Sequence, residues 1–553
     1  MDRRDFLTAQ RKKIQRATPA FRTQSGINAY TGPWTTNEVQ HLLKRTMFGS
    51  RKTDMNYFAS KSMSAAVDGI LNPTAPPPPP PLNDYNSATI IDPAVAPGTT
   101  WVNAPTNDGT INSARRSSFK KWWTGVMLNQ DRSIREKLTL FWANHFGTET
   151  TDIGNANYAY AHHALLRANA LGNFKSLVKM VTIDAGMLRY LNGYLNTNTA
   201  PDENYGRELQ ELFTIGKDPV TNLAPYTEDD VKKAAKVLTG WRINGATFSS
   251  YFDPTKHDST TKTFSSFYGG TSIAGRSGSA GAVETDDLLN MIFSKQEVSK
   301  FIVRKLYRWF VYYKIDDATE ANVISPLADL FRSSGYEVKP VLSTLFKSEH
   351  FFDVANQGCM IKSPVDQVIS CMREFNVIFP DAAVDYATAY GMWNYLYSTM
   401  SNMGQNIGDP PNVSGWPAYY QLPMFHELWI NSDTYPKRNR FTDTMINTGY
   451  TRSGKKIIID AVAFAKTLSK PSDPNILLDD ILNIIYRVPL SATVKQTTKQ
   501  QLLLSNQVSD HYWTDAWNNY LNTPSDVANY NTVNTRLKSL LQYLMALAEY
   551  QLS

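Results

Sequence analysis

The chain has 553 residues, of which 42% are hydrophobic and 19% charged. This mix excludes a largely disordered protein, and the length predicts two or three structural units. The net charge of +6 is spread thinly, which argues against a nucleic-acid-binding protein. No stretch of about 18 apolar residues occurs, so no transmembrane segment is predicted.

Residues 1–33 are predicted to form an N-terminal arm. Its start, Arg3-Arg4-Asp5-Phe6-Leu7, resembles the twin-arginine export motif. A signal peptide also needs a following apolar stretch of about 7–15 residues, and here polar and basic residues follow. We therefore expect a cytoplasmic protein, with a periplasmic or envelope location through export with a partner as the alternative.

A first helical part is predicted for residues 34–240, with a proline-rich insertion at 73–112. The insertion contains an unbroken proline run from Pro76 to Pro81. Such a run forms an extended polyproline helix. We expect a stiff surface spacer, and a docking site for a proline-binding partner is the alternative.

Helix starts within this first part follow from capping patterns. Ser133 and Glu136 have the spacing of a capping box, and the helix that follows carries His145 on its apolar face. Thr227 is predicted to cap another helix, which Gly240 ends.

Three further regions follow along the chain. Residues 241–285 are rich in Gly, Ser and Thr and predict a loop-rich or β-rich insertion, which at this length is often functional. Residues 286–450 predict a second helical part, and residues 451–553 a C-terminal helical region. The predicted fold is therefore mostly α, a multi-helical globular array with a polyproline surface loop and a small β-rich insertion.

The two cysteines, Cys359 and Cys371, lie twelve residues apart and match no zinc or redox spacing. We expect two buried free thiols, because cysteine is often a small core residue. A disulfide between them is the alternative.

Five local patterns together resemble the family called domain of unknown function 1800, over roughly residues 35–450. The element Arg-Glu-Leu-x-Glu-Leu-Phe-Thr-x-Gly is the most specific of them. In chain order the patterns are Phe141-Trp142-Ala143-Asn144-His145-Phe146, Glu203 to Gly216, Leu238-Thr239-Gly240-Trp241, His257-Asp258, and Gly404-Gln405 leading to Pro410 through Pro417.

The resemblance implies no assigned activity. Members of that family are often encoded beside a second family, numbered 1501, which looks like the alkaline phosphatase and sulfatase fold. The resemblance therefore implies a phosphatase- or sulfatase-like companion protein. Two departures predict an altered pocket: Ser259-Thr260-Thr261 precede Lys262 without a glycine, and Ala418 to Leu428 separate the Gly-Trp-Pro element from Trp429.

The motif helix, predicted over residues 203–215, carries the strongest candidates for chemistry. Glu208 and Glu211 are three residues apart, so their carboxylates are neighbours and can share a proton or hold a divalent cation. Arg207 can bind an anionic group or neutralise Glu211, and Asn204 lies on the same polar side. A solvated face with an internal ion pair is the alternative.

Two histidine elements add to these candidates. His145 is either a metal or substrate ligand or a hydrogen-bonded core residue. His257 with Asp258 can form a metal-ligand pair or an acid/base couple, or Asp258 can simply stabilise a turn. If these residues converge with Glu208 and Glu211, metal-assisted hydrolysis or glycan cleavage becomes conceivable.

The predicted binding residues are Trp241, Lys262, Gln405 and Trp416. The tryptophans can present rings to a sugar or peptide ligand, and packed tryptophans at turns explain them equally well. His162-His163 are adjacent, so we expect their side chains to point in different directions and not to act as a pair.

These observations lead to two functional hypotheses. The first is a binding or assembly partner in an envelope-associated or polysaccharide-related pathway, together with the companion protein. The second is a hydrolase with a Glu/His centre, and a purely structural scaffold is a weaker third.

Overall fold

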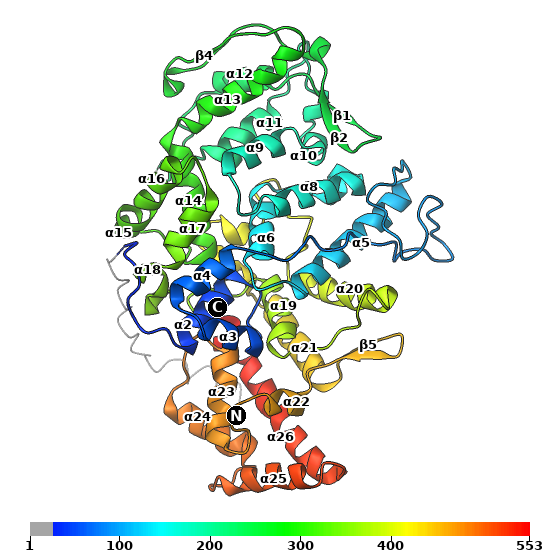
Figure 1. Ribbon diagram of the computed structural model, residues 1–553, viewed down its shortest axis with the longest axis vertical. Coiled ribbons are helices and arrows are strands. Elements are labelled where there is room, and N and C mark those ends of the chain that lie inside the picture. Colours follow the sequence, from blue (N-terminus) through cyan, green and yellow to red (C-terminus); the bar gives the residue numbers. More distant parts are fainter. Residues whose placement is uncertain (1–25, 220) are drawn as a thin grey trace.

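The computed structural model describes residues 26–219 and 221–553, and this part of the chain is mostly helical (Figure 1). The predicted fold class is confirmed. Among the described residues, strands form only short antiparallel pairs, and no helix is long and apolar enough to span a bilayer. The twin-arginine-like start lies outside the described residues.

The first helical part contains eleven α-helices within the described residues. Thr227 caps the last of them in a capping box with Asp230, so that predicted helix start is confirmed. The helices are α2 (Thr36–Thr46), α3 (Lys52–Ala59), α4 (Met63–Leu71), α5 (Gly109–Leu128), α6 (Arg135–His145), α7 (Thr150–Ile153), α8 (Ala156–Ala168), α9 (Phe174–Thr182), α10 (Ala185–Tyr190), α11 (Glu203–Glu208) and α12 (Glu228–Val237).

The capping box predicted at Ser133 is wrong. Helix α6 begins at Arg135 and has no side-chain cap. The Glu136 carboxylate instead accepts two hydrogen bonds from Arg167 of α8, at 2.6 and 2.9 Å. Burial of Glu136 against α8 therefore overrides the local capping pattern.

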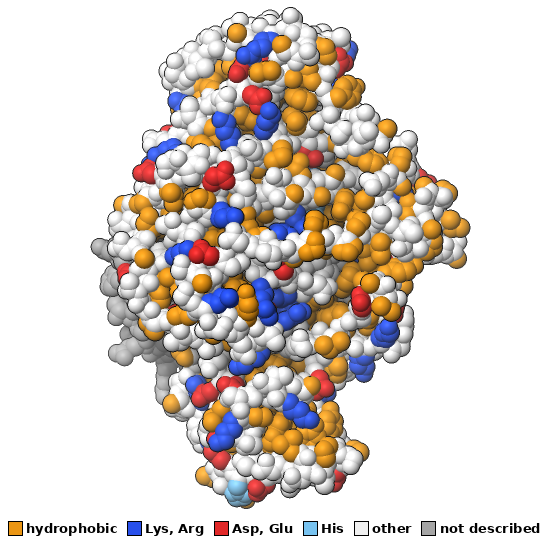
Figure 2. Space-filling model, in the orientation of Figure 1, with side chains coloured by type: hydrophobic (Ala, Val, Ile, Leu, Met, Phe, Trp, Pro, Cys, Tyr) orange, Lys and Arg blue, Asp and Glu red, His pale blue; other side chains and the backbone are white. Residues whose placement is uncertain are grey.

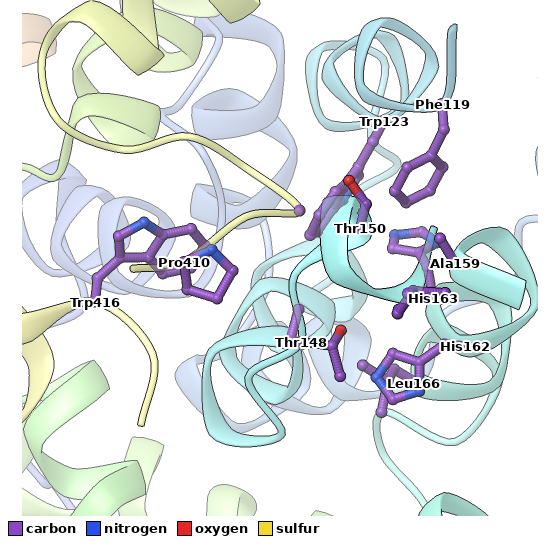
Figure 3. Close-up of a pocket in the computed structure, with 13 residues that line it drawn as sticks. Phe119, Trp123, Thr148, Thr150, Ala159, His162, His163, Leu166, Pro410 and Trp416 are labelled. Atoms are coloured by element: carbon purple, nitrogen blue, oxygen red, sulfur yellow. The ribbon is translucent and has the colours of Figure 1, made fainter. Parts of the chain in front are cut away.

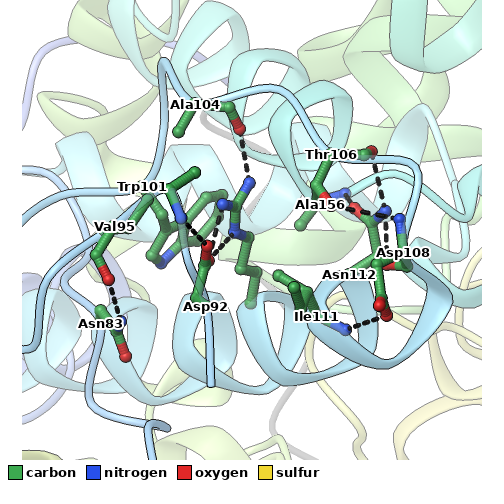
Figure 4. A network of polar contacts seen from close by, with 12 residues as sticks. Asn83, Asp92, Val95, Trp101, Ala104, Thr106, Asp108, Ile111, Asn112 and Ala156 are labelled. Atoms are coloured by element: carbon green, nitrogen blue, oxygen red, sulfur yellow. Dashed lines mark hydrogen bonds and ion pairs between the residues drawn. The ribbon is translucent and has the colours of Figure 1, made fainter. Parts of the chain in front are cut away.

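The proline-rich insertion is fixed to the body by a buried polar network (Figure 4). The Arg115 guanidinium of α5 donates to the Asp92 carboxylate at 2.6 and 2.9 Å. Tyr85 donates to the same carboxylate at 2.7 Å, and the Asn83 amide donates to the Val95 carbonyl at 2.8 Å. A satisfied buried network of this kind holds a loop in one conformation.

The predicted β-rich insertion contains two small antiparallel pairs. In the first pair Trp241 faces Phe252, and in the second Lys262 faces Ile273. The strands are β1 (Trp241–Asn244), β2 (Ser249–Phe252), β3 (Lys262–Thr263) and β4 (Ser272–Ile273).

The second helical part packs back onto the first. Helix α20 lies against α5, and a Cβ on Gly125 of α5 would lie 2.6 Å from the Trp393 ring. The helices are α13 (Glu284–Phe293), α14 (Gln296–Phe310), α15 (Asp317–Thr319), α16 (Ser325–Ser333), α17 (Val338–Phe346), α18 (Glu349–Phe352), α19 (Pro364–Glu374), α20 (Tyr386–Asn402) and α21 (Thr434–Asn447).

The C-terminal region forms one end of the molecule in Figure 1, and the chain then returns to the body. Ser553 donates its backbone N–H to Met360 at 2.8 Å, and one hydrophobic core cluster runs from Val39 to Tyr550. The elements are β5 (Tyr450–Arg452), β6 (Lys455–Ile457), α22 (Ala461–Lys466), α23 (Pro474–Ile485), α24 (Ala492–Thr498), α25 (His511–Asn522) and α26 (Val527–Ala546).

Both cysteines are free thiols, as predicted, with Cys371 buried and Cys359 only partly buried. On the face drawn in Figure 2, basic and acidic side chains are both scattered among apolar ones. This face therefore carries charges of both signs, in agreement with the small net charge.

Candidate functional site

Three motif segments pack together at the end of α6. The Asn144 side-chain oxygen accepts a hydrogen bond from the Trp416 backbone N–H at 2.9 Å. Gly415 has φ +88°, and a Cβ there would lie 2.3 Å from that oxygen, so the position requires glycine. We call this contact region the motif junction, and its segments are residues 141–148, 207–216 and 404–417.

His145 links two of these segments to helix α14. Lysine can only donate, so the His145 Nδ1 accepts from the Lys305 ammonium at 3.0 Å. The Nε2–H then donates to the Phe213 carbonyl at 3.1 Å. Burial, and then the Lys305 charge, hold the pKa of His145 well below its usual range. His145 is therefore a neutral, hydrogen-bonded residue of the core.

The motif helix is not the single α-helix that the sequence predicts. Helix α11 ends at Glu208, and Leu209–Thr214 form a π-helical turn, a feature that often marks functional sites. Glu211 pairs with Lys217 at 2.6 Å. Glu208 is half-buried and has no hydrogen-bond or ion-pair partner in the described chain.

The environment of Glu208 favours its protonated form. Burial, and then the negative charge of Glu211, raise the pKa of Glu208 to about 6. A carboxyl group with this pKa can exchange a proton near neutral pH. Glu208 is thus the acidic residue of the motif helix best suited to proton transfer.

Arg207 does not neutralise Glu211, so that sequence alternative is wrong. Its two terminal nitrogens donate to the Glu228 carboxylate at 2.7 Å each, and Glu203 lies at 3.4 Å. Helix α12 packs along α11 and supplies an acid in better geometry for the guanidinium. Asn204 is exposed on the same helix.

His257 lies in a buried triad with Lys262 and Glu284 in the insertion. Its Nδ1 lies 3.0 Å from the Thr239 carbonyl, and its Nε2 lies 3.1 Å from the Glu284 carboxylate. Lys262 donates to the other oxygen of Glu284 at 2.6 Å. Asp258 is not the partner of His257; its carboxylate accepts from the Thr260 backbone N–H at 2.8 Å. The triad ties β3 to the first turn of α13.

The residues predicted to converge are thus distributed over separate arrangements. His145 contacts Phe213 and Lys305, whereas His257 contacts Thr239 and Glu284. In the described chain, no hydrogen bond or ion pair joins either histidine to Glu208. Residues 26–219 and 221–553 also contain no group of three or more His, Cys, Asp or Glu placed to hold a metal ion.

The predicted binding residues are engaged by the protein itself. The Gln405 side-chain oxygen accepts from the Val365 N–H at 3.0 Å, and Trp416 is buried. The Trp241 indole donates to the Thr285 hydroxyl at 3.1 Å. These contacts match the packed-tryptophan alternative more closely than a ring presented to a ligand.

A cavity of about 20 Å³ borders the motif junction, and its lining includes Thr148 and Trp416 (Figure 3). This volume is enough for one water molecule. His162 and His163 both line it, but they contact different neighbours, as predicted: the His163 ring packs against Trp123. His162 Nδ1 lies 2.9 Å from the Asp184 carboxylate. Burial holds the pKa of His163 well below its usual range.

His163 also borders a much larger space, which we call the proline-walled pocket. This pocket measures about 510 Å³, within the usual range for small-molecule sites. The proline-rich insertion forms one wall, and helices α5, α6 and α8, far apart from it in the sequence, supply most of the other lining residues. The lining residues include Pro73, Pro77, Pro78, Trp122, Arg135, Tyr160 and Arg167.

The chain matches one known protein family. The family model described as "Protein of unknown function (DUF1800)" matches residues 41–552. The chain belongs to the DUF1800 family. The predicted resemblance is confirmed, and the match extends through the C-terminal region. No curated protein and no solved structure gives a significant match.

Sequence reasoning missed three important residues of this DUF1800 protein. Glu284 looks like an ordinary acidic residue in the first turn of a helix. Lys305 lies 160 positions from its partner His145. The sequence around Tyr160 indicates an aromatic residue in a helix and gives no sign that it lines a pocket. None of the three had a local signal, because each acquires its role through contacts between distant segments.

Proposed function

We propose that this DUF1800 protein is a binding component that holds a saccharide in the proline-walled pocket. The supporting observation is the pocket itself, which combines a rigid wall, aromatic rings and cationic donors in about 510 Å³. Each of these surfaces restricts the chemistry of a ligand, and together they favour a polyhydroxylated one.

The proline wall offers carbonyl groups but few donors. Proline has no backbone N–H, so Pro77 and Pro78 present only acceptors to the pocket. The wall is also anchored: Trp122 donates to the Pro79 carbonyl at 2.7 Å, and Arg135 donates to the Ala75 carbonyl at 3.0 Å. A preformed wall reduces the entropy lost on binding.

The opposite side offers rings and donors. The Trp122 and Tyr160 rings lie 5.6 Å apart in an edge-on arrangement, and Arg135 and Arg167 provide N–H groups. Arg167 is already neutralised by Glu136, whereas Arg135 donates to backbone carbonyls and forms no ion pair among the described residues. Sugar hydroxyls both donate and accept, and sugar C–H faces pack on aromatic rings, so a saccharide satisfies all three surfaces.

Replacing Tyr160 by alanine is expected to weaken saccharide binding about tenfold, because losing one ring contact costs about 1.4 kcal/mol. Calorimetric titration with maltohexaose, cellohexaose, chitohexaose and a hexauronate measures this. The matched control is Tyr543→Ala, whose tyrosine is 41% exposed and does not line the pocket. If the folded wild type binds none of the four probes, the saccharide proposal is wrong.

The proposal extends to the pathway that the family resemblance implies. The binding component would work beside a phosphatase- or sulfatase-like companion in an envelope or polysaccharide-related pathway. Gel filtration of the two proteins together tests this part. Co-elution at micromolar concentration supports it, and separate peaks contradict it.

A hydrolase is the second candidate, and Glu208 favours it. A general acid must be protonated to act, and the pKa of Glu208 near 6 means that activity falls as the pH rises through 6. Glu208→Gln is expected to lower turnover of chromogenic glycosides at pH 5.5 at least about a hundredfold. Glu203→Gln, on the same helix, is the control. No turnover by the wild type contradicts the hydrolase.

A further inference from the structure

Helix α14 carries two cations that lack an acidic partner. Lys305 and Arg308 are three residues apart and so lie on one face of the helix. Both are half-buried, and neither forms an ion pair within the described chain. Their neighbour Arg304, by contrast, pairs with Glu320 at 2.5 Å. Lys305 and Arg308 thus differ from Arg304 in having no acidic partner at ion-pair distance among the described residues.

The immediate contacts of the two cations are all neutral. The Lys305 ammonium contacts the neutral His145 ring at 3.0 Å and the Leu212 carbonyl at 3.3 Å. Arg308 uses its Nε to donate to the Tyr313 carbonyl at 3.2 Å, and its guanidinium lies 5.5 Å from the Phe425 ring. The two terminal nitrogens of Arg308 have no hydrogen-bond partner among the described residues.

Such a pair is costly without a counter-charge. Desolvated cations need an anion or good acceptors, and two cations on one face repel each other. Burial, and then the Arg308 charge, lower the pKa of Lys305 to about 7. Burial, and then the Arg304 charge, lower the pKa of Arg308 to about 10, and the Glu320 carboxylate offsets this only in part. Near neutral pH the Arg308 guanidinium therefore lies beside a lysine that is only partly protonated, and a bound anion would favour the protonated form of Lys305.

The position of the pair also suggests a ligand rather than a chance surface arrangement. The two cations contact the end of α6, the π-helical turn and the 417–429 segment. The first two of these segments belong to the motif junction. One turn earlier on α14, the Phe301 ring packs against Gly216 of the motif helix, where a Cβ would lie 2.4 Å from the ring. Three chain segments thus hold the two cations in place.

We propose that Lys305 and Arg308 form a binding site for a phosphate or sulfate group. The unused guanidinium nitrogens of Arg308 suit a two-point contact with a tetrahedral oxyanion, and the Lys305 ammonium supplies a second charge beside it. The group can belong to a free inorganic ion or to an ester on a larger molecule. This site is independent of the proline-walled pocket and of the saccharide proposal.

The test is the thermal stability and calorimetry of the full chain with inorganic phosphate, inorganic sulfate and glucose 6-phosphate. A ligand that binds only the folded state raises the melting temperature. We expect 10 mM phosphate or sulfate to raise the melting temperature of the wild type above that in chloride of equal ionic strength, in agreement with a Kd of about 1 mM or tighter. Tighter binding of glucose 6-phosphate than of phosphate identifies an ester as the ligand, and the reverse order identifies the free ion.

Lys305→Met and Arg308→Gln are each expected to reduce phosphate affinity at least tenfold. Both variants should fold, because each removes a poorly compensated charge, and circular dichroism verifies this. Lys300→Met, which removes a cation elsewhere on the same helix, is the matched control. The proposal is overturned if phosphate and sulfate stabilise the wild type no more than chloride does. It is also overturned if Lys300→Met loses as much affinity as the two site variants.

Discussion

Replacing Glu284 by glutamine is expected to lower the free energy of unfolding by about 3–5 kcal/mol, the usual cost of removing one partner of a buried ion pair. The Glu284 and Lys262 side chains are both 0% exposed, and they meet at 2.6 Å. Glutamine keeps the shape and one oxygen but not the negative charge. The Lys262 ammonium would then stay buried without a counter-charge, and His257 would lose the carboxylate at 3.1 Å.

Urea unfolding at pH 7, followed by circular dichroism, measures this change. The control is Asp287→Asn on the same helix, because Asp287 pairs with Arg276 while its side chain is 33% exposed. An exposed pair of this kind contributes at most about 1 kcal/mol. If the two variants lose equal stability, the triad does not anchor the insertion as its geometry indicates.

Replacing Gly415 by alanine is expected to lower the free energy of unfolding by about 3 kcal/mol, through backbone strain and a steric clash. Gly415 has φ +88°, and the added Cβ would lie 2.3 Å from the Asn144 side-chain oxygen and 2.5 Å from the Asn144 carbonyl oxygen. The side-chain oxygen cannot move away without breaking the hydrogen bond that it accepts from the Trp416 N–H. The variant should therefore disturb the motif junction itself.

Gly404→Ala separates the two contributions. Gly404 lies in the same loop with φ +98°, but a Cβ there has no neighbour within 4 Å. Its substitution adds only the strain of a positive φ, about 1 kcal/mol. If the two variants have equal free energies of unfolding, the close packing of Gly415 against Asn144 does not contribute to stability.

Several features of this DUF1800 protein follow from the sequence alone. The predicted cap at Thr227 marks the start of a helix that the structure contains. The Gly-, Ser- and Thr-rich composition of 241–285 predicts the insertion with its small strand pairs. The five motifs predict the family, and the apolar face of α6 predicts the burial of His145. All of these depend on interactions between residues close in sequence, which local patterns record.

Other features were decided only by the tertiary structure. Arg207 binds Glu228 and not Glu211, His257 contacts Glu284 and not Asp258, and the motif helix ends in a π-helical turn. The proline run becomes one wall of a pocket only because α5, α6 and α8 supply the remaining lining. The energy of a charged group depends on which neighbours exclude water from it and which charges they bring. Burial is the largest cause of the pKa shifts of Glu208, Lys305 and Arg308, and the partners of Glu284 come from another chain segment, so packing set the chemistry of all four.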